Sequence, residues 1–204
     1  RWRALTALML LMPGTPMLFQ GQEFSASSPF LYFADFEPEL ALAVKKGRSE
    51  FLMQFPSARA FASTAPFDAP EDPRTFVRCK LDFSERFTHA EAYALHRDLL
   101  RLRRETPAFS SQRRGACDGA VLSSAAFALR FFADGGDDRV VIVNLGADLK
   151  RNSFAEPLLA AAAGRHWRVE WSSEDPAYGG LGLADIWPEN RWCLPANTAI
   201  VIAP

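Results

Sequence analysis

The chain of 204 residues is long enough for one or two domains, and 49% apolar with 12% aromatic residues is the composition of a folded globular protein. Its 23 basic and 24 acidic side chains give a formal net charge of −1. That balance argues against a nucleic-acid partner, because neutralising phosphates needs a basic excess. Three cysteines without CxxC spacing argue against a disulfide framework and favour a reducing compartment, so a cytoplasmic location is expected.

The N-terminal segment predicts a helix, a turn and a strand. Residues 2–12 are apolar nearly all round and predict a buried helix that Pro13 and Gly14 end. Residues 16–20 predict a short buried strand of a parallel sheet. The apolar stretch falls far short of the ~20 residues that span a bilayer, and no cleavage site follows, so neither a membrane span nor a signal peptide is expected.

Helix, turn and buried strand form the repeating unit of an α/β fold, of which a complete barrel needs about eight. One such unit is visible here, and the chain begins at Arg1 rather than at a methionine. We therefore expect the remaining units of the sheet to lie in a segment upstream of this chain.

The middle of the chain predicts little regular structure. Residues 21–36 are expected to form an aromatic-rich loop, and residues 38–46 a short helix that Gly47 ends in a left-handed conformation. Residues 55–87 contain four prolines and predict an irregular stretch laid over the surface of something larger.

Residues 88–105 give the strongest helical pattern. Thr88 and Glu91 predict a capping box, and a core face is expected at Ala92, Leu95, Leu99 and Leu102. An arginine stripe on the opposite side could contact phosphate, but at this net charge a solvated helix face is favoured; it consists of Arg97, Arg101 and Arg104.

Short strands follow, which predict a small antiparallel β domain from about residue 115. Residues 126–132 and 139–144 flank an Asp-Gly-Gly-Asp-Asp turn and predict a hairpin. That turn lacks the spacing and the closing glutamate of an EF-hand, so a calcium loop is not favoured. Residues 167–172 and 192–203 predict further strands.

Common catalytic motifs are missing from the sequence. There is no GxSxG nucleophile motif, and the three histidines, His89, His96 and His166, lack the spacing of a zinc site. The glycine-rich segment 178–182 has no Lys-Ser/Thr after it and predicts an ordinary surface turn rather than a phosphate loop. Neither a metal nor a cofactor is expected.

The informative segment is GTPMLFQGQE, residues 14–23. Residues just past the C-terminal end of a barrel strand face the active site, and Gly21, Gln22 and Glu23 occupy that position. Glu23 is either a functional carboxylate or a structural one that accepts hydrogen bonds from neighbouring loops. Glycoside hydrolysis needs two carboxylates at a defined separation, and nothing marks Asp35 or Glu37 as the second.

Aromatic residues gather at positions 30–36. Phe30 and Phe33 could stack on sugar faces, or they could pack in a core or a domain interface. Both interpretations remain open at this point.

At these residues the sequence resembles a known family. Gly14, Pro16, Gly21 and Glu23 match the eighth-strand pattern of the α-amylase superfamily of glycoside hydrolases. Within it the chain resembles the C-terminal portion of the malto-oligosyltrehalose trehalohydrolases through SSPFLYFADF, KKGRSEF, DPRTFVRCKLDF, VVIVNLG, WRVEWSSE, YGG and WCLP. It departs from them at Phe36 and Phe83, where histidine and tryptophan are usual, and at Cys79, where serine is usual.

The resemblance implies an α/β barrel fragment, the last strand and helices of a TIM-type barrel, followed by a small antiparallel β-sheet or sandwich domain. Residues 1–110 would end the (β/α)8 catalytic barrel, and residues 111–204 would be the C-terminal all-β domain. The parent enzyme would release trehalose from maltooligosyl trehalose, with its catalytic carboxylates upstream of Arg1 and none in this chain. Substrate-binding positions would be Gln22, Glu23, Phe30, Phe33 and Asp35.

Two other functions remain open. The parent could be a related α-glucan branching or debranching enzyme, or the chain could be a non-catalytic carbohydrate-binding module. In each case the expected partners are an α-glucan and the missing N-terminal part of the same protein, with no nucleic acid and no membrane.

Overall fold

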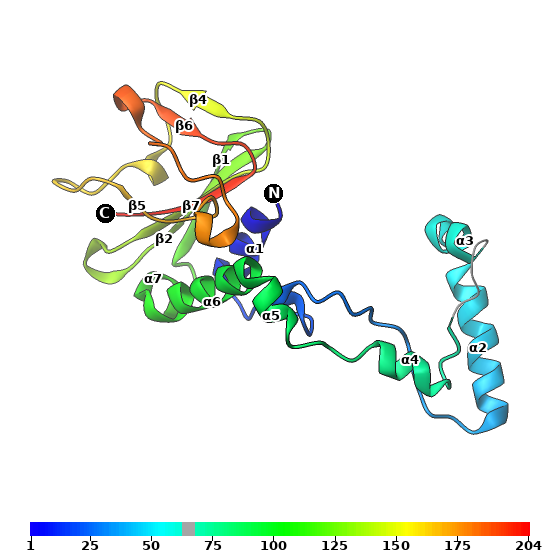
Figure 1. Cartoon of the computed structure of the whole chain (residues 1–204). Coiled ribbons are helices and arrows are strands. Elements are labelled where there is room, and N and C mark those ends of the chain that lie inside the picture. Colours follow the sequence, from blue (N-terminus) through cyan, green and yellow to red (C-terminus); the bar gives the residue numbers. More distant parts are fainter. Residues whose placement is uncertain (63–67) are drawn as a thin grey trace. The chain divides into compact units, whose positions relative to one another are not determined.

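The computed structural model describes residues 1–62 and 68–204, which divide into two compact units (Figure 1). The sheet unit comprises Arg1–Ser25 and Glu85–Pro204, and the helical unit comprises Ala26–Ser84. Residues 63–67 of the predicted irregular stretch lie outside the described residues.

The sheet unit is built on a five-stranded antiparallel sheet with the strand order β1-β2-β3-β7-β5. Its strands are β1 (Cys117–Ser123), β2 (Ala126–Phe131), β3 (Arg139–Asn144), β5 (Arg168–Ser172) and β7 (Thr198–Ala203). A second antiparallel sheet pairs β4 (Leu149–Arg151) with β6 (Trp192–Leu194). The predicted antiparallel β domain is therefore confirmed.

The predicted hairpin is also confirmed, with Phe131 opposite Arg139 in the β2–β3 register. The carboxylate of Asp138 closes its turn by accepting hydrogen bonds from the Ala133 amide and the Arg130 guanidinium, both at 2.9 Å. The single strand predicted over residues 192–203 is wrong. Pro195 has no amide hydrogen, and Asn197 has φ +54°, so the chain breaks there into β6 and β7 of different sheets.

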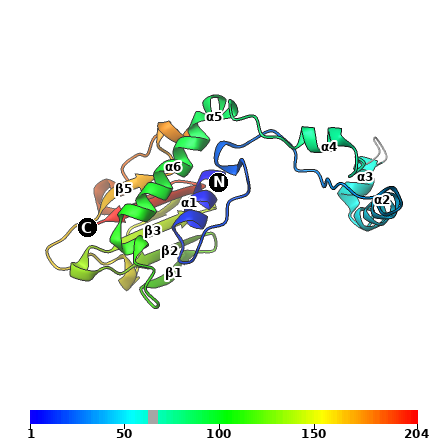
Figure 2. The ribbon, with the colours of Figure 1, turned by 90° about the horizontal axis from the view of Figure 1, so that it is seen from below.

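Two hydrophobic clusters cover the two faces of the five-stranded sheet. Helices α1 (Trp2–Leu11), α6 (Ala90–Glu105) and α7 (Pro107–Ser110) lie against one face (Figure 2). The β4–β6 sheet and the 3-10 helix η3 (Pro157–Leu159) cover the other. Of the remaining 3-10 helices, η1 (Gln22–Phe24) and η4 (Pro176–Tyr178) contact α6, η2 (Asp134–Gly136) lies between β2 and β3, and η5 (Pro188–Asn190) precedes β6.

The helix predicted at the N-terminus is confirmed, but its burial is one-sided. Ala4, Ala7 and Leu10 are fully buried against the sheet, whereas Trp2 is half-exposed. The strand predicted over residues 16–20 is wrong for this structure. No β-ladder joins that segment to the described part of the chain, and Met17 is 87% exposed. A strand forms only beside a hydrogen-bonded neighbour, and this segment has none among the described residues.

Helix α6 buries Ala92, Leu95 and Leu99 as predicted, and its arginine stripe is exposed. The predicted capping box is wrong. Thr88 ends a separate short helix, α5 (Glu85–Thr88), and His89 is the residue that precedes α6.

The helical unit is more regular than the sequence predicts. Helix α2 (Pro38–Leu52) runs through Gly47, which lies in a helix interior rather than at a left-handed end. Helices α3 (Pro56–Ala62) and α4 (Pro73–Arg78) stand within the stretch predicted to be irregular. Pro56 and Pro73 mislead because each begins a helix, where the missing amide hydrogen costs nothing.

The structure does not separate the chain at residue 110. Leu95 and Leu99 of the predicted barrel segment share one core with Val141 and Val201 of the predicted β domain. The domain boundary at 110/111 therefore stays a prediction about the longer protein.

Candidate functional site

The turn that carries Gln22 and Glu23 is sharp, as the sequence predicts. It is the 3-10 helix η1, bracketed by Gly21 at φ +79° and Ser25 at φ +51°. Glycine adopts that left-handed conformation without strain, whereas serine does so at a cost. The turn therefore needs contacts from outside itself to hold its shape.

Three contacts hold this turn. The Gln22 side-chain oxygen accepts a hydrogen bond from the Phe19 amide at 3.1 Å. The Phe24 side chain is completely buried. The Phe24 carbonyl lies 2.9 Å from Nδ1 of His89, and because a carbonyl can only accept, His89 is the donor.

Glu23 itself is half-buried. Among the described residues, no hydrogen bond or ion pair engages its carboxylate. The structural role considered above, in which neighbouring loops donate to Glu23, gains no support from this part of the chain.

The upstream end of the same segment is held by the last turn of α6 and by Gln112, which follows α7. The Arg103 guanidinium donates to the carbonyls of Leu10, at 2.8 Å, Met12, at 2.7 Å, and Gly14. The Gln112 side-chain oxygen accepts the Gly14 amide at 2.7 Å. Burial lowers the pKa of Arg103 from its usual value.

The aromatic positions lie in the helical unit and differ in role. Phe33 is half-buried and packs edge-on against Phe76, with ring centroids 5.0 Å apart. Phe30 is 59% exposed and borders a cavity of about 410 Å³. Asp35 is exposed. Phe30 also packs edge-on against Phe33, with ring centroids 6.3 Å apart, and it is the more exposed of the two rings.

Charged residues that the sequence analysis did not single out line the same cavity. The Arg48 guanidinium lies 3.9 Å from the centre of the Tyr32 ring, and Arg78 pairs with Asp68 at 2.5 Å. A cavity that combines aromatic rings with paired donors and acceptors suits a hydroxyl-rich ligand.

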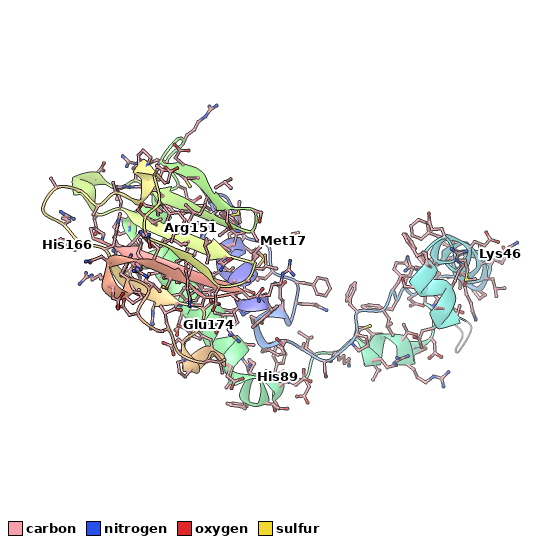
Figure 3. All side chains as sticks on the ribbon, turned by 90° about the horizontal axis from the view of Figure 1, so that it is seen from above. Met17, Lys46, His89, Arg151, His166 and Glu174 are labelled. Atoms are coloured by element: carbon pink, nitrogen blue, oxygen red, sulfur yellow. The ribbon has the colours of Figure 1, made fainter. Side chains whose placement is uncertain are left out.

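The predicted site residues thus fall into two groups. Gln22 and Glu23 belong to the sheet unit, and Phe30, Phe33 and Asp35 belong to the helical unit. Figure 3 labels Met17, His89 and Glu174 on the sheet unit and Lys46 on the helical unit.

Two negative findings apply to the described part of the chain. It contains no group of three His, Cys, Asp or Glu side chains able to hold a metal ion. No helix in it combines the length and apolar character that crossing a bilayer requires.

Comparison with known proteins first indicates the class of protein to which the fold is similar. Residues 114–200 match a family described as "Domain of unknown function (DUF3459)". The whole chain superposes, with a TM-score of 0.66 and 25% identity, on 30% of a crystal structure described as a candidate α-amylase from Salmonella typhimurium. It also shares the fold of 22% of pullulanase type I from Bacillus subtilis, with a TM-score of 0.51, 16% identity and 98% of this chain covered. The antiparallel sheet with its helices is thus similar in structure to α-amylase-family enzymes.

Curated relatives narrow the class. The malto-oligosyltrehalose trehalohydrolase of Deinococcus radiodurans is 39% identical over 150 residues, which is 71% of this chain and 23% of that protein. The trehalohydrolases of Arthrobacter ramosus and Rhizobium sp. M-11 are 43% and 41% identical over 57% and 58% of this chain and 20% and 19% of their own lengths. The chain is therefore homologous to the C-terminal portion of malto-oligosyltrehalose trehalohydrolases, as the resemblance predicted. It spans less than a quarter of the length of these relatives.

Proposed function

We propose that the chain is the C-terminal part of a glycoside hydrolase that releases trehalose from maltooligosyl trehalose. The bond cleaved is the α-1,4-glucosidic bond next to the trehalose unit. The observation that carries this proposal is the 39% identity over 150 residues to the Deinococcus radiodurans trehalohydrolase. The activity belongs to the whole protein, of which this chain supplies one part.

In that protein, residues 1–110 would complete a (β/α)8 barrel and residues 111–204 would form the C-terminal β domain. The exposure of Met17 and Phe19, at 87% and 54%, supports the first part, because a barrel strand buries such side chains only when its sheet neighbours are present. The five-stranded antiparallel sheet supports the second.

Within the proposed enzyme, Gln22, Glu23, Phe30, Phe33 and Asp35 contact the α-glucan. The half-buried carboxylate of Glu23 and the exposed ring of Phe30 support this assignment. The catalytic carboxylates are proposed to lie upstream of Arg1. A carboxylic acid there would protonate the leaving oxygen, and a carboxylate would form the glycosyl-enzyme intermediate that water then hydrolyses with retention.

The same resemblance leads us to propose a cytoplasmic enzyme that uses no cofactor. Its partners would be the α-glucan substrate and the N-terminal part of the same protein.

Product analysis of the whole protein tests the proposed function. The protein is incubated with maltooligosyl trehalose and, in parallel, with a maltooligosaccharide of the same length. We expect free trehalose from the first substrate only. Branched or debranched products without trehalose would instead indicate the related α-glucan enzyme. The chain by itself is expected to release no trehalose, and release above background would show that it contains its own catalytic groups.

A further inference from the structure

We propose that helix α6 positions Glu23 for the substrate, with His89 at its N-terminal end and Arg103 in its last turn as the two positioning residues. This inference rests on the proposed function, in which Glu23 contacts the sugar. It adds residues that the sequence pattern around Glu23 does not reveal.

His89 fixes the backbone next to Glu23. Its Nδ1 donates to the carbonyl of Phe24 at 2.9 Å, one residue beyond Glu23. The neighbouring Ser25 has φ +51°, a left-handed conformation that is unfavourable for a residue with a side chain. A turn with such a residue holds its conformation only if outside contacts over-determine it, and His89 supplies a hydrogen bond of the required kind.

Arg103 fixes the other end of the segment. Its guanidinium donates to three carbonyls around the end of α1, those of Leu10, Met12 and Gly14. These oxygens include groups that a helix end leaves without an intrahelical partner. The start of the segment that leads from α1 to Glu23 is therefore fixed by hydrogen bonds from α6.

Helix α6 can serve as this frame because its own position does not depend on the turn. Leu95 and Leu99 are completely buried in the core that α6 shares with the five-stranded sheet. Removing the His89 hydrogen bond should therefore loosen the turn while the sheet stays intact. A residue needed only for folding would weaken both.

A double-mutant cycle in the whole enzyme separates these cases. We expect His89→Ala to lower kcat/KM for trehalose release by about three- to tenfold, the range that one hydrogen bond supports. In a Glu23→Ala background the same change should cost less than about twofold, because the positioned group is gone. His89→Asn should recover most of the loss, since its amide nitrogen can replace Nδ1 as the donor. The exposed His166 provides the matched control as His166→Ala.

Arg103 is tested in the same way with Arg103→Met and Arg103→Lys, and lysine should recover part of the loss because it can still donate to a carbonyl. Arg104→Met, on the exposed side of the same helix turn, is its control. Equal losses in the two Glu23 backgrounds, or an asparagine variant as poor as alanine, would overturn the positioning role.

Hydrogen exchange on this chain keeps the result separate from the proposed function. We expect the amides of residues 22–25 to exchange at least about fivefold faster in His89→Ala, while those of β3 and β7 stay unchanged. Unchanged exchange at the turn would overturn the inference whatever the enzyme does. A whole protein that releases no trehalose, with the turn loosened as expected, would instead overturn the proposed function and with it the substrate role of Glu23.

Discussion

A single methyl group at Gly180 is expected to destabilise the sheet unit. A Cβ built there would lie 2.2 Å from both the carbonyl carbon and the oxygen of Glu174, and 2.5 Å from its Cα. Carbon atoms in contact prefer roughly 3.5–4.0 Å. All three neighbours are backbone atoms, so no side-chain rotation can relieve the overlap. The turn interpreted from sequence as an ordinary surface turn is therefore closely packed.

The size of the loss in unfolding free energy depends on which contacts of the Glu174 backbone and side chain are disturbed. Inserting a methylene or methyl group into a tightly packed site costs about 1–3 kcal/mol. A shift of Glu174 would also disturb its ion pair with Arg3, at 2.9 Å, and the hydrogen bond from the Gly182 amide to its carbonyl, at 2.7 Å. Weakening these contacts adds about 1 kcal/mol. We expect Gly180→Ala to lower the free energy of unfolding by about 2–4 kcal/mol.

Urea unfolding followed by circular dichroism measures this change, with the slope of the transition checked for constancy. Gly119→Ala is the matched control within the same unit. The nearest atom to its added Cβ is Cδ2 of Leu129 at 3.0 Å, the end of a flexible side chain that can move aside. We expect it to cost less than about 1 kcal/mol. A Gly180→Ala variant within about 0.5 kcal/mol of the parent would refute the steric reasoning.

Three further predictions use the same unfolding assay. Asn144→Ala should cost about 2–3 kcal/mol, because its buried amide donates to the backbone carbonyls that join β3 to the β4–β6 sheet, whereas the exposed Asn152→Ala should change little. Gly47→Ala should stabilise the helical unit by about 0.5–1 kcal/mol, since Gly47 is helical and its added Cβ meets nothing; a loss of stability would contradict this. Burial raises the pKa of Tyr178 to about 12 from its usual 10, so the stability it contributes below pH 10 should be lost as the pH rises through 12, and Tyr178→Phe should remove this loss.

Local patterns were enough to predict much of the sheet unit. The apolar spacing of Ala92, Leu95 and Leu99 identified the buried face of α6, and the glycine-rich acidic turn identified the β2–β3 hairpin. These features depend on residues close in the chain, so their signal is contained in one short window.

The wrong predictions of secondary structure have a common cause. Each depends on information that the local residue type does not carry, namely a distant pairing partner or the residue's position within a helix. Residues 16–20 carry an apolar strand pattern, but a strand forms only beside a partner. Glycine is a common residue at helix ends, yet α2 continues past Gly47 through Arg48–Leu52. A proline-rich stretch suggests irregular chain, whereas Pro56 and Pro73 begin helices.

The candidate site was predictable only in part. The position of Glu23 after a sharp glycine turn could be inferred from the segment itself. The residues that hold it could not, because His89 lies 65 positions from Phe24 and Arg103 lies 89 positions from Gly14. Periodicity reports which face of a helix is buried, but it does not report which distant carbonyl a side chain at the helix end will reach.

Hydrogen bonds made by α6 connect the C-terminal sheet to the segment that carries Glu23. Helix α6 is tied to the β5–η4 region through Asp98, which accepts a hydrogen bond from Tyr178, which in turn accepts one from Trp171, each at 3.1 Å. The hydrogen bonds from Arg103 then tie the start of the Glu23 segment to α6. Because these hydrogen bonds join the sheet to α6 and α6 to the Glu23 segment, the C-terminal sheet is part of the proposed frame that orients Glu23.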